Sequence, residues 1–499
     1  MILRNSIFKI TCYALTTLLV FLTIPIIIDS LGVEVFGVIG IVTSFVSYLT
    51  IITNSFSSSV SRNLIFLLNS SNFKEANKEF NSVLFLIIII GVVVYPFLYY
   101  SAESFASVLN ISDQSSPSVI FLVRSVFFVF FVSSVAGIFG SVYVIRDRYD
   151  LQSISDMFQK IILNMLVITL LIYWDTSLYS YSVALLISSL FIVSFNSLFF
   201  YRLLGEVKVS PSLFSTSRLS SNLSLSWWLM INQIGALLYH QSSLILVGIF
   251  VGVAHAGFLA ISLTISSQVR VLATLISSVF QTKMIRYVAN ENDEQANDFF
   301  LKVVMVISVI VVLVCSLFLG GSKWVLSVWL GKVDPQVLIL CIICTSYLPI
   351  ILNLIPTWSF LLAKNDVSFM GKITFINGIL NVVVSVILLK TTDMGVYAAI
   401  IPFITLLLAQ NLIIVPLILK KHKVNIVKLY KIIVCSAIAT LILTAFVFVF
   451  FKVIEPQTLI ELFLVYLFIL LILLFLFILY SLFKFKTLNL KLSLTQLFS

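Results

Sequence analysis

Apolar residues occur along this chain in long, unbroken runs, and few segments alternate between apolar and polar positions. A helix that crosses a bilayer needs roughly 20 apolar residues, and the runs have that length. They are too long for the strands of a membrane barrel, whereas a helix satisfies its own backbone in lipid. The pattern therefore predicts an all-α integral membrane protein with about 14 transmembrane helices, near residues 8–28, 36–60, 80–100, 118–144, 156–173, 179–201, 225–250, 256–280, 299–320, 337–361, 369–389, 394–419, 431–451 and 458–483.

A pair of glycines at the junction of the first two runs returns later in the chain. Gly32 and Gly37 match Gly252 and Gly257, each displaced by 220 residues. The polar segment 74–80 matches 294–300 at the same displacement, and Asn164 matches Asn381 at 217. Ordered matches in polar loops indicate a chain built from two copies of one unit.

Each copy holds six predicted spans, and an even number returns the chain to the same side of the membrane. The repeat is therefore parallel, with a pseudo-twofold axis along the membrane normal. We expect an N-lobe at residues 1–208, a cytoplasmic linker at 209–222 and a C-lobe at 223–423. Residues 424–499 would carry two appended spans and a cytoplasmic tail. Pro349 and Pro356 predict a broken helix around Asn353 in span ten.

Composition supports the membrane interpretation, since 61% of the residues are hydrophobic and only 10% are charged. A soluble domain is about a quarter charged. The five cysteines all lie in apolar runs, and Cys341 and Cys344 have no histidine near them in sequence. They are therefore interpreted as small buried apolar residues, with neither a disulfide framework nor a metal site.

The net charge of +10 follows from topology. If the N-terminus is inside and the spans alternate, nearly all basic residues fall on the inner side. The outer side has only Lys323, Lys332, Lys390 and Lys452. This bias predicts that both termini are cytoplasmic. The positive charge is accordingly no sign of nucleic-acid binding.

The Leu-Gly-x-x-x-Phe-Gly junction at 31–37 resembles that of the polysaccharide transporters, as do its echo at Gly252 and Gly257 and the Gly395–Ala399 segment. The basic cluster at 420–423 agrees. The whole chain resembles the O-antigen flippases (Wzx type) of the multidrug/oligosaccharidyl-lipid/polysaccharide exporter superfamily. The resemblance implies a non-enzymatic transporter in a bacterial cytoplasmic (inner) membrane.

Members of that family move an undecaprenyl-diphosphate-linked oligosaccharide, in O-antigen or capsule synthesis, from the cytoplasmic to the periplasmic leaflet. The resemblance implies no bound cofactor, a H⁺ or Na⁺ gradient as the drive, and an O-antigen polymerase and chain-length regulator as partners. The sequence agrees in having no nucleotide-binding Gly-x-x-x-x-Gly-Lys-Ser/Thr loop.

Two arginines fall inside predicted spans. Arg270 lies about 14 residues into span eight, roughly 21 Å deep, and Arg124 about 6 residues into span four, roughly 9 Å deep. A buried arginine usually faces a wet cavity or an anion, and guanidinium suits a diphosphate because its parallel N–H groups meet two oxygens. We therefore expect Arg270, helped by Arg124, to bind the head group. The alternatives are an interhelical bond for Arg270 and snorkelling for Arg124.

Other candidates lie at the inner mouth and along the spans. Arg62, Lys160, Lys283 and Lys372 could form a basic vestibule, or serve only as topology charges. Asn232, Gln233 and Gln268 could line a sugar path or join helices. His240 and Asp29 are the candidates for ion coupling, against a satisfied interior histidine and a solvated acid.

Two rival functions stay open at this stage. A multidrug exporter of the same superfamily would share the repeat, but resemblance to that branch requires an acid buried in the first lobe, which the sequence lacks. A membrane-embedded O-antigen polymerase or ligase would resemble proteins with a large periplasmic loop. The outer loops here are short and acidic.

Overall fold

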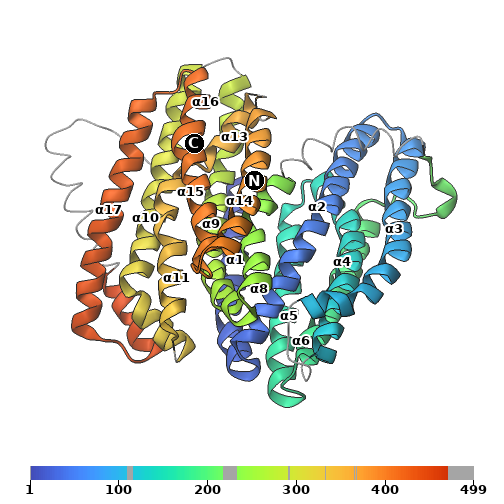
Figure 1. Ribbon diagram of the computed structural model, residues 1–499. Helices are drawn as coiled ribbons and strands as arrows, with labels where there is room; N and C mark the ends of the chain where they lie inside the picture. The colour runs from blue at the N-terminus through green and yellow to red at the C-terminus, as the bar shows by residue number, and fades with distance from the viewer. Residues whose placement is uncertain are drawn as a thin grey trace.

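The computed structural model describes residues 2–108, 116–216, 233–289, 293–331, 333–364, 366 and 368–469, and these are helical almost throughout (Figure 1). The first half contains six long helices. They are α1 (Ile2–Leu31), α2 (Val33–Asn69), α3 (Phe73–Val108), α4 (Ser116–Ile145), α5 (Tyr149–Tyr173) and α6 (Leu178–Leu203), followed by the short η1 (Pro211–Leu213).

The second half repeats the order with more breaks. It contains a helix at Gln233–His240, α8 (Ser242–Phe250), α9 (Val253–Ala289), α10 (Asp293–Leu330), α11 (Pro335–Ser346), α12 (Leu348–Ile351), η2 (Leu352–Leu354), α13 (Pro356–Ala363), α14 (Ser368–Thr391), α15 (Tyr397–Ala409), η3 (Gln410–Ile414) and α16 (Val415–Lys421). After these come α17 (Ile426–Ile454) and a helix at Leu459–Ile469.

Within the described ranges, 12 helices are long and apolar enough to cross a membrane, or 13 with the bent pair around residue 241. The helix at Leu459–Ile469 begins the fourteenth predicted span, and the rest of that span lies outside the described residues. The predicted all-α class is confirmed, whereas the count of fourteen is not.

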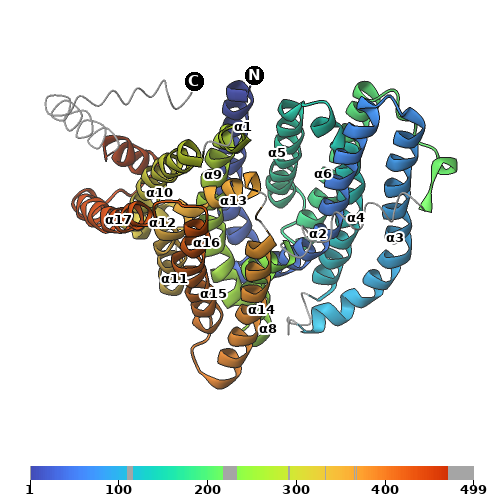
Figure 2. The same cartoon turned by 90° about the horizontal axis from the view of Figure 1, so that it is seen from above.

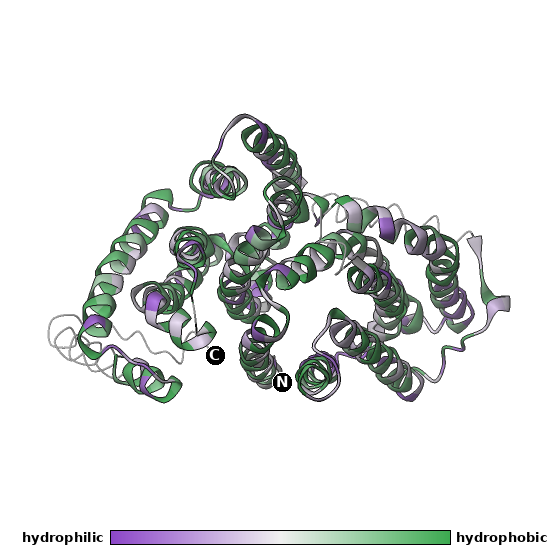
Figure 3. Ribbon diagram, turned by 60° about the horizontal axis from the view of Figure 1, so that its bottom comes forward, coloured by the Kyte–Doolittle hydropathy of each residue, from purple (hydrophilic) through white to green (hydrophobic). Residues whose placement is uncertain are grey.

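Apolar side chains cover the outward faces of the helices. Phe97 on α3 is 74% exposed and Leu441 on α17 is 71% exposed. Hydrophobic residues run along both halves of the molecule (Figure 3). Such surfaces are stable only against lipid tails, so the chain is a multi-pass membrane protein.

The helices form two lobes, as predicted. Seen from above, α2 to α6 form one group and α9 to α17 the other (Figure 2). We call the end with the Gly32 and Gly252 junctions the joint end, at the bottom of Figure 1. The opposite end, with the loops around residues 72, 147, 205 and 422, is the basic end.

The repeated glycines meet one another at the joint end. Gly32 and Gly252 both have positive φ, of 85° and 127°, which turns the chain between two helices. A Cβ on Gly37 would lie 2.2 Å from the carbonyl oxygen of Val253, and one on Gly257 would lie 2.2 Å from that of Val33. The reciprocal contact is what a twofold axis between α2 and α9 produces, so the repeat read from sequence is confirmed here.

A second repeated residue, an asparagine, makes the same kind of hydrogen bond at the basic end of each lobe. Asn77, at the start of α3, donates its amide N–H to the Glu206 carbonyl oxygen at 3.2 Å. Asn297, displaced by 220 and at the start of α10, donates to the His422 carbonyl oxygen at 3.1 Å. In each lobe one amide therefore ties the third span to the chain that follows the sixth.

Apolar packing joins the lobes at one end only. A single core at the joint end contains Ile24, Ile41 and Val126 together with Val247, Leu259 and Leu340. Toward the basic end there are two separate cores, one around Phe80 and Phe200 and one around Phe300 and Phe360. The lobes are therefore packed together at the joint end and separate toward the basic end.

Two spans of the second lobe are broken. The break predicted in span ten is confirmed, and the Asn353 amide there donates to the Pro349 carbonyl oxygen at 2.7 Å and to Ser436 Oγ at 2.8 Å. Span seven, predicted as one run at 225–250, bends by 41° between His240 and Ser242. The run holds neither proline nor glycine at the bend, where Gln241 accepts a hydrogen bond from Ser44 on α2.

Candidate functional site

A cavity of about 610 Å³ lies between the two lobes. The first lobe contributes Thr23, Thr43, Ser44, Lys160 and Asn164 to its lining, and the second His240, Gln241, Thr264, Ser266, Ser267 and Arg270. Apolar side chains such as Ile27 and Phe36 close it toward the joint end. Polar and positively charged side chains thus line part of a space whose other walls are apolar.

Arg270 provides the fixed positive charge of this cavity. It lies on α9, 17 residues after Val253, which places it about 26 Å along the helix from the joint end. Its Nη1 is 3.1 Å from Nε2 of His240 on the neighbouring span. Among the described residues no carboxylate forms an ion pair with Arg270, so its charge is available to a ligand.

The Arg270 contact fixes the chemical state of His240. A guanidinium can only donate hydrogen bonds, so Nε2 of His240 must accept and carries no proton. The imidazole is therefore neutral, with its proton on Nδ1. The ring also packs edge-on against Phe403 at 5.7 Å between centroids. Protonation of Nε2 would remove the acceptor and place a second positive charge against Arg270.

Polar bonds at the bend of span seven hold the two lobes together beside the cavity. Ser44 on α2 donates to Oε1 of Gln241 at 2.9 Å, and the Tyr48 hydroxyl donates to the Leu237 carbonyl oxygen at 3.1 Å. The bend thus places Gln241 and His240 next to the first lobe.

Gln268, predicted to line a sugar path, joins α1 to α9. Its side-chain oxygen accepts from the Tyr13 hydroxyl and from Thr17 Oγ1, the latter at 3.3 Å, and Tyr13 also donates to the Gln268 carbonyl oxygen at 3.0 Å. The structure thus gives Gln268 the interhelical role that the sequence left as the alternative.

Only Lys160 of the predicted vestibule reaches the cavity. It also lines a smaller space of about 110 Å³ with Lys9, Tyr13 and Asp156. Arg62 and Lys372 are exposed, and the Lys283 ammonium lies 5.7 Å from the centre of the Phe299 ring. The structure does not bring these three into the cavity lining.

Arg124 is held away from the cavity. Its guanidinium pairs with Glu103 at 2.9 Å, donates to the Tyr99 carbonyl oxygen at 3.2 Å and lies 4.1 Å from the centre of the Tyr99 ring. These partners all come from α3. Arg124 therefore connects α3 to α4, and it is not part of the cavity lining that contains Arg270.

The other predicted residues also lie apart from Arg270. Asp29 is exposed next to the joint, and Gln233 is half-buried but not part of the cavity lining. Asn232 falls outside the described residues. Sequence reasoning missed the hydroxyl lining, although the repeat offered a signal because Ser44 and Thr264 are displaced by 220.

Known proteins with a similar fold are membrane transporters. The lipid II flippase MurJ, in an inward closed conformation, superposes with a TM-score of 0.67 at 14% identity, covering 94% of this chain and 98% of its own. An inward-facing multidrug resistance MATE family transporter of the MOP superfamily gives 0.65 at 15% identity, covering 84% and 99%. The two-lobe transporter fold is thereby established.

Sequence comparison adds a relative and a family. The uncharacterized membrane protein EpsK of Bacillus subtilis (strain 168) is 24% identical over 413 residues, which is 82% of this chain and 81% of the relative. A model of the polysaccharide biosynthesis protein family matches residues 2–279, more than half of the chain. Because this match covers more than half of the chain, the chain belongs to the polysaccharide biosynthesis protein family.

Proposed function

We propose that this protein is a flippase that moves an undecaprenyl-diphosphate-linked oligosaccharide, an O-antigen or capsular unit, from the cytoplasmic to the periplasmic leaflet. The family match, the similarity to a lipid II flippase and the positively charged interlobe cavity support this assignment. The unequal distribution of lysine and arginine supports placing the basic end, and both termini, in the cytoplasm. The cavity then opens toward the leaflet on which the substrate is made.

Arg270 is the residue on which the proposal chiefly rests. A guanidinium with no ion-pair partner among the described residues is costly inside a membrane bundle unless an anion or water meets it. Two parallel N–H groups fit two oxygens of a diphosphate. The hydroxyl-rich walls at Thr43, Ser44 and Ser267 suit a sugar, which needs hydrogen bonds in place of those it leaves in water.

His240 makes the binding of the anion sensitive to protons. An anion on Arg270 draws the guanidinium away from Nε2 of His240, which leaves that nitrogen free to take a proton. A protonated His240 in turn repels Arg270 toward the anion. Proton and diphosphate binding are therefore linked, each favouring the other. Asp29 has no such contact with the cavity.

Alternating access follows from the arrangement of the lobes. The α2–α9 crossing at Gly37 and Gly257 closes the joint end, and the inner cores are separate. Rocking one lobe against the other would close the basic end, and separating the contacts at that crossing would open the joint end.

The test is translocation of an undecaprenyl-diphosphate oligosaccharide in proteoliposomes. Arg270→Gln should lower the rate by about 10- to 100-fold, because a charge-assisted hydrogen bond contributes about 1.5–3 kcal/mol. Arg124→Gln is the matched control and should stay within about twofold, since that arginine pairs with Glu103. A wild-type rate for Arg270→Gln, at equal protein per vesicle, would overturn the proposal.

A further inference from the structure

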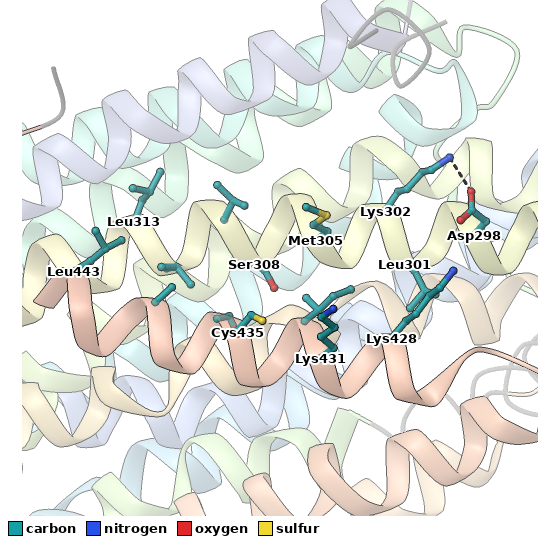
Figure 4. A pocket seen from close by; sticks show the side chains of 15 residues that line it. Asp298, Leu301, Lys302, Met305, Ser308, Leu313, Lys428, Lys431, Cys435 and Leu443 are labelled. Atoms are coloured by element: carbon teal, nitrogen blue, oxygen red, sulfur yellow. Dashed lines mark ion pairs between the residues drawn. The ribbon is translucent and has the colours of Figure 1, made fainter. Parts of the chain in front are cut away.

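A second hollow lies on the flank of the second lobe, between α10 and α17, with a volume of about 870 Å³ (Figure 4). It shares no lining residue with the interlobe cavity. Lining residues recur at three- and four-residue intervals from Asp298 to Leu313 and from Lys428 to Leu443, so each helix presents one stripe about 22 Å long. We call this hollow the α10–α17 groove.

The groove runs along two parallel helices whose backbones approach each other closely near the joint end. Toward the joint end a Cβ on Gly320 would lie 2.6 Å from Cβ of Val447, so the backbones are in close contact there. Trp324, Phe451 and Val465 pack together in the same region and seal it with the helix at Leu459–Ile469. Nearer the basic end Val304 of α10 and Ile433 of α17 belong to the core of the second lobe, and the groove lies beside that core, where Met305 and Val309 are exposed.

The basic end of the groove is positively charged. Lys302, Lys428 and Lys431 line it, with Asp298 as the one acid of the lining (Figure 4). Asp298 pairs with Lys302 at 2.7 Å. The structure gives Lys428 and Lys431 no ion pair within the described ranges, and Asn425 fixes their position by capping α17 through the Lys428 backbone N–H at 3.0 Å. Two lysines therefore lie at the mouth of the groove with their charge unmatched.

The body of the groove is apolar and has the depth of one leaflet. From Met305 to Leu313 and from Ile432 to Leu443 the stripes rise about 12 and about 16 Å. Half of the hydrocarbon core of a bilayer is about 15 Å. A charged mouth above an apolar slot of this length matches an anionic head group above acyl chains of the inner leaflet.

Ser308 adds a polar contact inside the slot. Its side chain is 5% exposed, it lines the groove, and its hydroxyl has no hydrogen-bond partner among the described residues. It lies about 9 Å below Lys302 along α10. A hydroxyl there can donate to an ester carbonyl, which a glycerophospholipid carries and a polyprenyl diphosphate does not.

We propose that the α10–α17 groove is a binding site for one anionic glycerophospholipid of the leaflet at the basic end, separate from the transport cavity. The phosphate lies between Lys428 and Lys431, the ester region meets Ser308, and the acyl chains fill the slot beside Met305 and Ala439. Because the site is on the outside of the lobe, lipid enters it directly from the bilayer.

Native mass spectrometry of the delipidated full chain, titrated with phosphatidylglycerol or phosphatidylcholine, tests the site. The wild-type protein should retain phosphatidylglycerol in preference to phosphatidylcholine. The double variant Lys428→Gln/Lys431→Gln should bind it about 30-fold more weakly, the loss expected for two lysines at an anionic surface. Lys74→Gln/Lys208→Gln removes the same charge from the other lobe at the same end, and should bind like wild type.

A second measurement uses Cys435, which lines the groove and is the exposed one of the five cysteines. Bound phosphatidylglycerol should slow its alkylation by N-ethylmaleimide, and phosphatidylcholine should not. Ala439→Trp fills the slot without changing charge and should abolish phosphatidylglycerol retention, while Ser308→Ala should weaken it several-fold.

Three outcomes would overturn the proposal. One is equal phosphatidylglycerol retention in the groove double variant and the control. Another is equal alkylation of Cys435 in both lipids. The third is displacement of phosphatidylglycerol from the groove by stoichiometric undecaprenyl diphosphate, which would make the groove part of the substrate path.

Discussion

The two lobes share the residues that pack their helices together, and they differ in Arg270 and His240, which face the cavity. The glycine junctions, the α2–α9 crossing and the Asn77 and Asn297 bonds appear once in each lobe. Arg270 and His240 do not, because the residues displaced from them by 220 are Thr50 and Val20. Repeated residues thus build the frame, whereas the charged residues of the cavity, Arg270 and Lys160 of the first lobe, are not repeated.

This comparison distinguishes residues that are constrained by their size from residues that are constrained by their charge. A residue at the crossing is constrained by a backbone only 2.2 Å from where its Cβ would be, so size is what matters there. A residue such as Arg270 is constrained by charge in a space of about 610 Å³, where size can vary. Substitutions at the crossing should lower the stability of the fold, whereas substitutions in the cavity should change the translocation rate.

The largest effect is expected at the crossing. Gly37→Ala and Gly257→Ala should each destabilise the protein by about 1–3 kcal/mol, because a backbone carbonyl has to move to admit the methyl group. Thermal unfolding in detergent measures the change. Gly91→Ala is the control, since its Cβ meets only the Phe131 side chain, at 3.2 Å. Markedly different losses at Gly37 and Gly257 would show that the crossing is not symmetric.

The next effect should appear in the cavity and only in the second lobe. His240→Gln keeps an oxygen that accepts from Arg270 but has no group to protonate. Its translocation rate in vesicles should therefore not respond to an imposed pH gradient, while its folded stability stays near wild type. Val20→Ala changes the equivalent position of the first lobe and should keep the response. A full response in His240→Gln would exclude this histidine as the proton site.

A smaller pair of effects is expected for the repeated asparagines. Asn77→Ala and Asn297→Ala each remove one amide-to-carbonyl bond at the basic end, and should each cost about 1 kcal/mol of unfolding free energy. Asn77 also accepts from the Lys208 backbone N–H, so its loss should be the larger of the two. Chemical denaturation of both variants in one detergent decides the order.

The smallest effect concerns an ion pair whose polarity is reversed between the lobes. Arg146 pairs with Glu206 in the first lobe, and Asp366 pairs with Lys421 and His422 in the second. Hydrogen bonds from Lys421 and then His422 lower the pKa of Asp366 below its ordinary value. The pair therefore stabilises the fold above pH ~4, the ordinary pKa of aspartate, and this stabilisation is lost as the pH falls through the lowered pKa.

Thermal unfolding of wild type and Asp366→Asn between pH 6 and pH 3 measures this contribution. The half-exposed position limits it to under about 1 kcal/mol. The wild-type advantage should be full at pH 6 and smaller at pH 3. If the stability difference between wild type and Asp366→Asn grew as the pH fell, the predicted direction of the pH dependence would be wrong.

Much of the fold was predictable because lipid imposes a simple rule. Long apolar runs gave the spans, and the displaced glycines gave the symmetry that the α2–α9 crossing then displays. The bend in span seven was missed because it depends on bonds such as Ser44 to Gln241, between residues 197 positions apart. Hydropathy along one run carries no information about such partners.

The site was predictable in part, for a related reason. Depth along a span singled out Arg270 and Arg124 alike, but depth does not say which way a side chain points. Arg124 finds Glu103 and Tyr99 on the adjacent helix, whereas Arg270 finds a neutral histidine beside a cavity. The direction of each side chain decides which partner it contacts, and depth along a span does not give that direction.

The side from which water reaches the interlobe cavity tests the account most directly. Ser267 is exposed and lines the cavity, so Ser267→Cys, in a variant without the native cysteines, reports access by a membrane-impermeant thiol reagent. Leu441→Cys, on the outer face of α17, is the control and should react from neither side. The account predicts that Ser267→Cys reacts from the cytoplasmic side and is protected from the other by the α2–α9 crossing. Reaction from the periplasmic side alone, or from neither side, would contradict it.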